Sequence, residues 1–519
     1  MRNLFLFFVL LYGIILCSSC RKDFSFAASS GNLEFSRDTV YLDTVFTNIG
    51  SATYNLKVYN PGNEDITIPT VRLGQGQVSH YRLNVDGQAG KEFENISILA
   101  KDSIFIFIET TVDIQEVSEG ETQFLYTDAI EFDSGEQQQT VPLVTLVQDA
   151  VFLYPQQFED GTTETLLPGT DDTGEEIRIA GFFLEDSELN FTADKPYVIY
   201  GYAAVDNGKT LSIDAGTRVH FHNNSGIFIA DGGTLEVNGA LSTDQELLEN
   251  EVIFEGDRLE PAFANVPGQW GTVWLAAGST AHNLNYLTIK NATVGILMEG
   301  NDGSGNPTLT LRNTQIYNAS NIGLWGKTAY IDAGNIVIGS AGQFSLYCNA
   351  GGNYTFKHCT FANYWNNSFR STPTVFIDNY MDTGNGDLLA QDLTEASFQN
   401  CIIYGNSTLE LLFDPVATAD FNYNFTNCLI KFDDLFGQFS GNPLYDFENP
   451  LLFGNSLFNE TPDFLDPNNN EFIISEASAA NNQGAPATAL EVPFDILGVD
   501  RTLNPDIGVY QHISFMVKE

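Results

Sequence analysis

The middle of the chain, from residue 284 to 430, alternates apolar and polar residues over short stretches. In one of them, Leu311 and Ile316 bracket a run of Arg, Asn, Thr and Gln. A helical repeat would instead carry apolar residues at spacings of three and four. Gly and Asn punctuate the stretches, and both residues favour tight turns. The pattern therefore predicts short β-strands joined by turns.

One phrase returns five times in this region. It reads NLNYLTIKNATVGI from Asn283, LRNTQIYNASNIG from Leu311, FKHCTFANY from Phe356, FQNCIIYGN from Phe398 and FTNCLIKFD from Phe425. Each phrase holds only one or two short strands, which cannot bury an apolar face alone, so the units must stack on their neighbours. Stacked coils of short strands predict a parallel β-helix.

The pattern changes along the chain and predicts an all-β protein with two folded domains. Residues 32–150 carry longer alternating strands separated by turns, which predicts a β-sandwich. Residues 151–176 are polar and rich in Gly and Thr, and we expect a linker there. From 177 to 519, short strands with Gly at their corners predict the β-helix.

The first domain resembles a known family. Its phrase DTVFTNIGSATYNLKVYNPGNEDITIPTVRL, from Asp43, is similar to the immunoglobulin-like modules of the ASH and HYDIN type. This resemblance implies an immunoglobulin-like β-sandwich that acts as an interaction or spacer module without catalysis.

The second domain resembles the right-handed, pectate-lyase-like parallel β-helix proteins of bacterial envelopes. The resemblance rests on the repeats and on a C-terminal pattern whose residues are Ser478, Asn482, Gly484, Gly498, Arg501, Pro505, Asp506, Ile507, Gly508 and Tyr510. It implies a closing coil that caps the solenoid, in which Arg501 and Asp506 could form a pair. The right-handed sense comes from the resemblance, not from the spacing.

The N-terminus predicts export. MRN precedes the apolar run LFLFFVLLYGIILC, which has the form of a signal peptide (residues 1–19) and not of a membrane span. The residues before Cys20 resemble the lipobox of bacterial lipoproteins, although Cys17 replaces the usual Leu. The resemblance implies that Cys20 carries lipid, that residues 20–31 form a tether, and that the protein is anchored to the cell envelope, with the outer membrane preferred.

Charge narrows the list of partners. The chain has 67 acidic and 22 basic residues and a net charge of −45. Such a surface repels the phosphates of nucleic acid, so we exclude nucleic acid as a partner. The acidity has two interpretations, a solubilising surface or divalent-cation binding.

Four cysteines fall in the folded body, Cys348, Cys359, Cys401 and Cys428. The last three occupy the same slot of the repeat, in HCT, NCI and NCL. Equivalent slots of a solenoid stack as columns, and Cys packs well as a small apolar residue. We therefore predict buried structural thiols.

The sequence supplies no catalytic residue that we can assign. Asp433 and Asp434 lack the neighbours that mark β-helical polygalacturonases. A lyase would need Lys or Arg beside Ca²⁺, but the basic residues of the repeats alternate with apolar neighbours as outward-facing side chains would. These residues are Lys290, Arg312, Lys327, Lys357 and Arg370.

Two stretches have donors for a metal ion. His220 and His222 share one face of a strand, but no third ligand is evident. Asp302, Ser304 and Asn306 alternate in a Gly-rich loop and form a candidate Ca²⁺ site, although the closing Glu of such loops is absent. A plain turn is the preferred interpretation of that loop. No cofactor is firmly implied, and Ca²⁺ is the one that the pattern admits.

Aromatic residues offer a surface for sugars, because sugar rings stack on aromatic faces. The candidates are Trp270, Trp274, Trp325, Tyr364 and Trp365, and the amides of Asn366 and Asn367 follow them. The candidate ligand site consists of Trp325, Tyr364, Trp365, Asn366 and Asn367, with packing as the alternative role for the rings.

Together these observations predict a lipid-anchored, non-catalytic envelope protein that binds polysaccharide or another envelope protein. Two alternatives remain: a polysaccharide lyase or glycosidase on a β-helix, and a structural component of an outer-membrane assembly or adhesin. Because the repeats themselves build the scaffold, we expect function in the loops 301–307 and 363–371.

Overall fold

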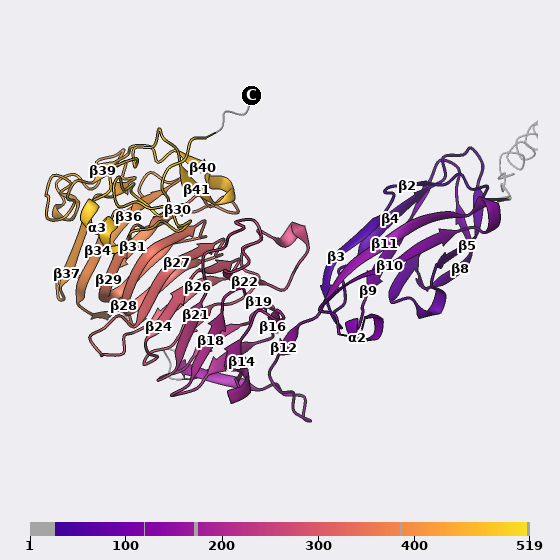
Figure 1. Ribbon diagram of the computed structural model, residues 1–519, viewed down its shortest axis with the longest axis horizontal. Coiled ribbons are helices and arrows are strands. Elements are labelled where there is room, and N and C mark those ends of the chain that lie inside the picture. Colours follow the sequence, from indigo (N-terminus) through magenta and orange to yellow (C-terminus); the bar gives the residue numbers. More distant parts are fainter. Residues whose placement is uncertain (1–25, 119, 171–174, 385–386, 516–519) are drawn as a thin grey trace, which may run out of the picture. The chain divides into compact units, whose positions relative to one another are not determined.

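The computed structural model describes residues 26–118, 120–170, 175–384 and 387–515. The predicted signal peptide and Cys20 lie outside these ranges. The chain divides into two compact units, Met1–Asp149 and Ala150–Glu519. Both are built from strands, so the predicted all-β class, a sandwich followed by a β-helix, is confirmed (Figure 1).

The first unit is an immunoglobulin-like sandwich of two sheets. One sheet has the order β1-β5-β10-β11-β3, with β8 beside β5, and comprises β1 (Ala27–Ala28), β3 (Val40–Phe46), β5 (Ile66–Leu73), β8 (Glu92–Ile98), β10 (Gln123–Phe132) and β11 (Gln139–Gln148). The other has the order β2-β4-β9-β6-β7, and comprises β2 (Glu34–Phe35), β4 (Tyr54–Tyr59), β6 (Tyr81–Val85), β7 (Gln88–Gly90) and β9 (Ser103–Thr110).

Alternation along each strand creates the core of this sandwich. On β9, Ile106 and Ile108 are fully buried between the sheets, whereas Phe105 and Phe107 are 47% and 44% exposed on the outer side. A short helix, α2 (Ile114–Val117), begins after Asp113, whose carboxylate accepts a hydrogen bond from the backbone N–H of Gln115. This is a standard N-cap, which satisfies a backbone donor that the helix leaves open.

The second unit is a parallel solenoid whose strands form three stacks, here named faces A, B and C (Figure 1). Face A contains β12 (Val151–Leu153), β16 (Tyr197–Ile199), β19 (Arg218–Phe221), β22 (Val252–Gly256), β25 (Leu287–Lys290), the end of β27 (Leu309–Tyr317), the end of β28 (Ile322–Gly339), β30 (Thr360–Asn363), β35 (Ile402–Gly405), β38 (Leu429–Ile430) and β39 (Leu457–Phe458).

Faces B and C complete each coil. Face B contains β14 (Glu176–Phe183), β17 (Tyr202–Val205), β20 (Gly226–Ile229), β23 (Val273–Leu275), β26 (Val294–Glu299), the starts of β28 and β29 (Leu346–Lys357), β31 (Val375–Asp378) and β36 (Leu411–Asp414). Face C contains β15 (Asn190–Phe191), β18 (Thr210–Asp214), β21 (Thr234–Asn238), β24 (His282–Asn285), the start of β27, the middle of β28, the end of β29, β34 (Leu393–Gln399) and β37 (Phe421–Thr426).

The repeated phrase is explained by the corner between faces C and A. One residue there has a left-handed backbone in each of five successive coils: Asn313, Asn335, His358, Asn400 and Asn427, with φ from 48 to 55°. Asn tolerates this conformation better than most residues. The amide of Asn335 donates to the Oδ1 of Asn313 at 3.0 Å, so the column also bonds along the solenoid axis.

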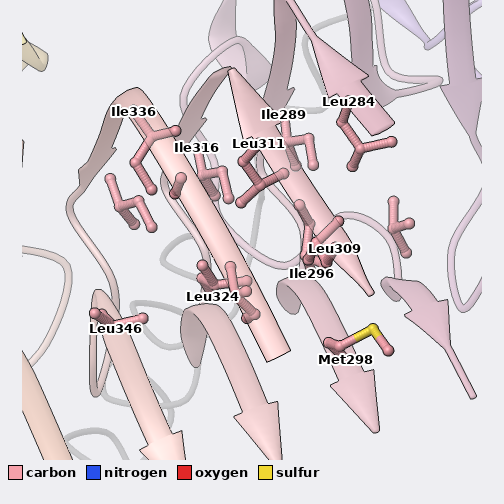
Figure 2. Close-up of a cluster of buried hydrophobic side chains, with 14 of the residues drawn as sticks. Leu284, Ile289, Ile296, Met298, Leu309, Leu311, Ile316, Leu324, Ile336 and Leu346 are labelled. Atoms are coloured by element: carbon pink, nitrogen blue, oxygen red, sulfur yellow. The ribbon is translucent and has the colours of Figure 1, made fainter. Parts of the chain in front are cut away.

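Inside the solenoid, equivalent residues stack in columns. Phe398 lies between Phe356 and Phe425, with ring centroids 4.9 and 4.6 Å away. Figure 2 shows side chains from the three faces, such as Leu311, Ile316 and Leu324, meeting in this core. The predicted cysteine columns are confirmed, since the four thiols are free and buried. Burial raises the pKa of the Cys359 and Cys401 thiols, which suits a packing role.

The C-terminal pattern forms more than a closing coil. Residues 461–515, here the C-terminal segment, include β40 (Phe464–Asp466), β41 (Glu471–Ile474) and α3 (Pro486–Glu491). Side chains of this segment, such as Phe472 and Ile507, pack on the outer surface of face A against Val337 and Ile402. The C-terminal segment therefore covers the flank of the solenoid.

The expected pair between Arg501 and Asp506 is not formed. Arg501 is fully buried and donates to the carbonyl oxygens of Gly508 and Val509 and to the Oδ1 of Asn335. Asp506 instead contacts His512, with Oδ2 2.8 Å from Nδ1. The guanidinium thus joins the C-terminal segment to the corner of the solenoid.

The segment expected to be a linker, 151–176, also differs from the expectation. Its first residues form β12, which pairs with β16 of face A. Further on, β13 (Thr165–Thr170) forms a hairpin with β14. The polar residues lie mainly in the loop between β12 and β13, whereas β12 itself belongs to face A of the solenoid.

Candidate functional site

The outer surface of face B carries a continuous row of large side chains. Adjacent strands pair Trp274 with Leu297, Leu297 with Trp325, Trp325 with Tyr347, and Tyr347 with Phe376. We call these five residues the aromatic column. Their neighbours in each strand, such as Leu324 and Gly326, point inward, so alternation sends the column outward.

The rings of this column form a platform. Trp325 and Tyr347 are stacked with centroids 5.8 Å apart and an interplanar angle of 12°. Phe344, from the turn before β29, stacks on Phe376 at 5.2 Å and contacts Tyr347 at 5.0 Å. All four rings are partly exposed. Because parallel strands repeat at about 4.8 Å, the platform offers rings at a regular interval along the solenoid.

A second row runs beside the first, two residues further along each strand. We call it the polar column, and its members are Glu299, Lys327, Asn349, Asp378 and Asp414. The two columns are joined by hydrogen bonds, because the indole Nε1 of Trp274 donates to Glu299 Oε2 at 2.8 Å. Lys327 Nζ lies 2.9 Å from Glu299 Oε1 and 4.4 Å from the centroid of the Trp325 ring.

Asp378 is the most buried member of the polar column, with 2% of its surface exposed. Its carboxylate accepts hydrogen bonds from the Tyr347 hydroxyl, the Asn349 amide and the backbone N–H of Ala350. Burial raises the pKa of Asp378, although these hydrogen bonds oppose the shift. The Asp378 carboxylate thereby fixes both the platform ring of Tyr347 and the left-handed turn at Ala350, where φ is 55°.

The two columns have the chemistry of a sugar-binding surface. Apolar ring faces can stack on the faces of pyranose rings, while the carboxylates of the partly exposed Glu299 and the exposed Asp414 beside them can accept hydrogen bonds from hydroxyls. Asp378 and Asp414 lie on adjacent strands, about 4.8 Å apart along the solenoid. Glycoside hydrolysis needs one carboxyl group to protonate the leaving oxygen and a second to act as base or nucleophile. The donors around Asp378 occupy that carboxylate, which gives it a structural role beneath the platform.

The structure brings together only part of the predicted ligand site. Trp325 lies in the aromatic column. Tyr364 lies on face A, where its ring contacts Phe464 and Phe472 of the C-terminal segment at 6.2 and 6.3 Å. Trp365 is 6% exposed, and its indole Nε1 donates to Ser368 Oγ at 2.8 Å.

Asn366 and Asn367 are exposed in the loop after Trp365. Tyr364 and Trp365 therefore act in packing, which was the alternative that the sequence left open. The amides of Asn366 and Asn367 share this loop with Phe369, which is 91% exposed.

The predicted cation loop is a compact turn. Asp302 Oδ1 accepts from the backbone N–H of Ser304, and Ser304 Oγ accepts from the backbone N–H of Asn306. These oxygens thus satisfy the loop's own backbone. The loop also lines a cavity of about 380 Å³ together with Tyr330, Asn353 and other residues of the corner between faces B and C. The Ca²⁺ site stays a prediction.

His220 lies in β19, and His222 follows the last residue of that strand. His220 is 5% exposed, with Nδ1 3.3 Å from the carbonyl oxygen of Gly256. His222 Nδ1 lies 2.7 Å from Asp257 Oδ2. Across the described ranges, no group of three or more His, Cys, Asp or Glu side chains could hold a metal ion.

The expectation that every basic residue of the repeats faces outward is wrong for Arg370. Its side chain is 1% exposed and forms an ion pair with Glu410, with Nη2 2.8 Å from Oε1. Thr374 also donates to Glu410 through its N–H and its hydroxyl, at 2.9 and 2.7 Å. The pair holds the loop before β31 against face B. A buried pair of this kind needs such additional hydrogen bonds to offset desolvation.

Other sequence candidates have structural roles. Trp270 is fully buried and stacks on Phe221 with centroids 4.3 Å apart. Asp434 accepts hydrogen bonds from the backbone N–H groups of Gln438 and Phe439, and so closes a turn.

Sequence reasoning missed most of the candidate site. Tyr347, Phe376 and the members of the polar column other than Lys327 were not among the candidates from the sequence. Trp274 was named as a candidate ring but was not part of the predicted ligand site. For Tyr347 and Phe376 the signal was present in alternation, because each stands between inward apolar residues in its strand. Their alignment across coils was hidden by loops of unequal length.

The comparisons with known proteins identify no family. No protein-family model and no curated protein matches the chain. A solved structure that is similar in part belongs to a family 123 glycoside hydrolase from Clostridium perfringens, with 10% identity, 23% of this chain and 26% of that chain covered, and a TM-score of 0.16. The chain thus spans about a quarter of that hydrolase, and so low a TM-score supports no conclusion about fold or activity.

The fold and the site define the class of protein by themselves. It is an all-β protein in which an immunoglobulin-like sandwich precedes a parallel β-solenoid, and one solenoid face exposes aligned aromatic and polar columns. Within the described residues, no helix is both long and apolar enough to cross a membrane.

Proposed function

We propose that this protein is a non-catalytic, lipid-anchored protein of the bacterial cell envelope that binds an extended polysaccharide along face B. One observation carries the proposal: aligned, partly exposed rings lie beside a parallel row of hydrogen-bonding side chains. A linear glycan presents alternating apolar ring faces and hydroxyl edges, so both columns can be used along its length.

The location in the envelope rests on the N-terminal sequence. The signal peptide and the lipobox-like residues before Cys20 support lipid attachment. Acyl chains contribute about 0.8 kcal/mol per buried methylene, so several of them hold a folded body at a membrane. We infer that the sandwich acts as a spacer between the anchor and the solenoid, as its resemblance to the ASH and HYDIN type implies.

Affinity electrophoresis tests the proposal. The full-length protein, kept in detergent, is run through native gels that contain neutral or acidic polysaccharides, and retardation reports binding. The double variant Trp325→Leu with Tyr347→Leu should lose at least about tenfold in affinity, since truncating central aromatic residues commonly costs more than 1 kcal/mol. Leu keeps apolar volume on the strand, and thermal unfolding checks that the solenoid stays folded.

Phe436→Ala is the matched control, because Phe436 is 92% exposed on a loop outside the aromatic column. It should bind as the parent does. Undiminished binding by the folded double variant would overturn the proposal. Release of shorter chains from any polysaccharide by the parent protein would replace it with the enzyme alternative.

A further inference from the structure

Face A contains a second concavity, which we call the face A groove. It has a volume of about 470 Å³ and lies where the C-terminal segment meets strands β25 and β27. Thr288, Lys290, Gln315 and Tyr317 form its floor, and Asn469 and Phe472 belong to the wall that the C-terminal segment supplies. Residues more than 150 positions apart in the chain therefore build one enclosure.

The groove has an aromatic side. The rings of Tyr317 and Phe472 are stacked at 6.4 Å with an interplanar angle of 29°. Tyr510, which is 8% exposed, also lines the groove. Phe472 is 1% exposed behind Tyr317, so the partly exposed ring of Tyr317 supplies the apolar surface of the groove.

The polar side is held in place by a buried carboxylate. Glu251 is 3% exposed, and its Oε2 accepts hydrogen bonds from Thr288 Oγ1 at 3.1 Å and from Gln315 Nε2 at 3.3 Å. The Tyr317 hydroxyl in turn donates to Gln315 Oε1 at 2.8 Å. This chain of hydrogen bonds fixes the orientation of three side chains that face the groove, so they are preorganised for a ligand.

We propose that the face A groove binds an uncharged, polyhydroxylated ring, such as one hexose unit. The side-chain amides of Gln315 and Asn469 match sugar hydroxyls, and the partly exposed ring of Tyr317 matches an apolar sugar face. The volume falls in the range of about 300–1,000 Å³ that is typical of small-ligand sites.

Charge selects against an acidic sugar. Lys290 lines the groove, but Glu255 lies opposite it on the adjacent strand of face A. Glu471 lines the groove from the C-terminal segment, and Glu251 lies behind its floor. Arg218 lies near the Glu251 and Glu255 carboxyl groups, so three carboxyl groups face two cations and give no net attraction for an anion. Neutral rings are therefore favoured over uronic acids.

The groove goes beyond the proposed function of face B, because no residue of the aromatic or polar column lines it. A polymer could bind face B without any sugar in the groove. Conversely, a free sugar could bind the groove of a protein whose face B binds no polymer. Each statement can therefore fail alone.

Saturation-transfer NMR on the full-length protein in detergent tests the inference with glucose, galactose, mannose and glucuronate as probes. At least one neutral hexose should give a saturable signal, and glucuronate should give none. Asn469→Trp fills the groove and should abolish that signal. Asn468→Trp is the matched control, because Asn468 is the exposed neighbour that does not line the groove, and it should keep the signal.

Tyr317→Phe removes only the hydroxyl that bonds Gln315, and it should weaken hexose binding severalfold without unfolding the solenoid. The double variant of Trp325 and Tyr347 should keep full hexose binding while it loses the polymer. Absence of any hexose signal from the parent protein, an equal signal with glucuronate, or equal loss in both tryptophan variants would each overturn the inference.

Discussion

Faces A and B are both stacks of parallel strands, but the C-terminal segment covers part of face A and leaves the rings of face B open. Along face A, outward residues such as Val337, Ile402 and Leu429 are buried beneath the C-terminal segment. Along face B, the rings of Trp325 and Tyr347 keep part of their surface exposed. The C-terminal segment covers aromatic rings of face A as well, such as that of Tyr364, whereas the rings of face B stay partly exposed. Cover by the C-terminal segment therefore separates structural contact from a surface available to ligands.

The largest expected effect comes from breaking the cover of face A. Arg501→Met should lower the free energy of unfolding by about 3–5 kcal/mol, because two carbonyl oxygens and the Asn335 amide lose a buried charged donor. Urea unfolding measures this loss, and limited proteolysis should release the C-terminal segment first. Arg72→Met in the sandwich, where the side chain of Arg72 is 46% exposed, should change stability by less than about 1 kcal/mol. Equal effects would mean that Arg501 does not hold the cover.

The next largest expected effect comes from comparing one side-chain truncation on face A with one on face B. Ile402→Ala on face A removes a side chain that is 1% exposed and should cost about 2–4 kcal/mol. Phe376→Ala on face B removes a larger but partly exposed ring and should cost only about 1 kcal/mol, mostly from lost ring contacts. Chemical denaturation of both variants measures the difference. A greater loss for Phe376→Ala would show that face B is packed as tightly as face A.

Acid should weaken the cover of face A. His358 occupies the left-handed corner beneath the C-terminal segment, with Nδ1 3.3 Å from the Gly508 carbonyl oxygen and Nε2 2.8 Å from the Asn400 amide. Burial, and then the charge of Arg501, holds the pKa of His358 well below its usual value. Near pH 6.5 the unfolded chain therefore binds a proton at His358 that the folded chain does not bind. The contribution of His358 to the free energy of unfolding is fully present above that pH and is lost as the pH falls below it.

The expected loss from this one group is at most about 1.4 kcal/mol between pH 6.5 and 5.5. His358→Asn provides the test, because Asn fills the same corner in the neighbouring coils and should accept its backbone, with φ of 52°. Unfolding free energies of both proteins, measured from pH 7.5 to 5, should diverge as the pH falls. The other buried histidines, such as His282 with a pKa lowered to about 4, act equally in both proteins. Parallel pH profiles would refute the role of His358.

Much of the scaffold could be predicted from local pattern. The alternation of apolar and polar residues predicts the strands, the repeated Asn indicates a corner, and the Cys position after it indicates an inward-facing column. These three patterns can be recognised because each depends only on residues that are neighbours in sequence. The cover of face A could not be predicted in this way. Tyr364 reads as an exposed ring after a strand, but residues about a hundred positions later fold back over it.

The candidate site was predictable only at Trp325. Its partners Tyr347 and Phe376 lie one and two coils away, and the turns between them differ in length. Which residues align across coils is set by register, and register depends on how each turn packs. Local alternation therefore assigned these residues to an outward face without showing that they form one column.

The smallest expected effect concerns Lys327, which separates the two roles of face B. Its ion pair with Glu299 is partly exposed, with 28% and 25% of the two side chains accessible, so Lys327→Met should change stability by at most about 1 kcal/mol.

Lys327 Nζ also lies 4.4 Å from the centroid of the Trp325 ring, where a sugar would have to compete with the ammonium. A cation on an exposed ring is worth about 0.5–1 kcal/mol, so its removal should tighten the binding of a neutral polysaccharide about two- to fivefold. Affinity electrophoresis of this variant beside Trp325→Leu measures the change. If Lys327→Met instead loses as much affinity as Trp325→Leu, the charge and not the ring carries the binding, and the contrast between the covered face A and the open rings of face B no longer explains how face B binds its ligand.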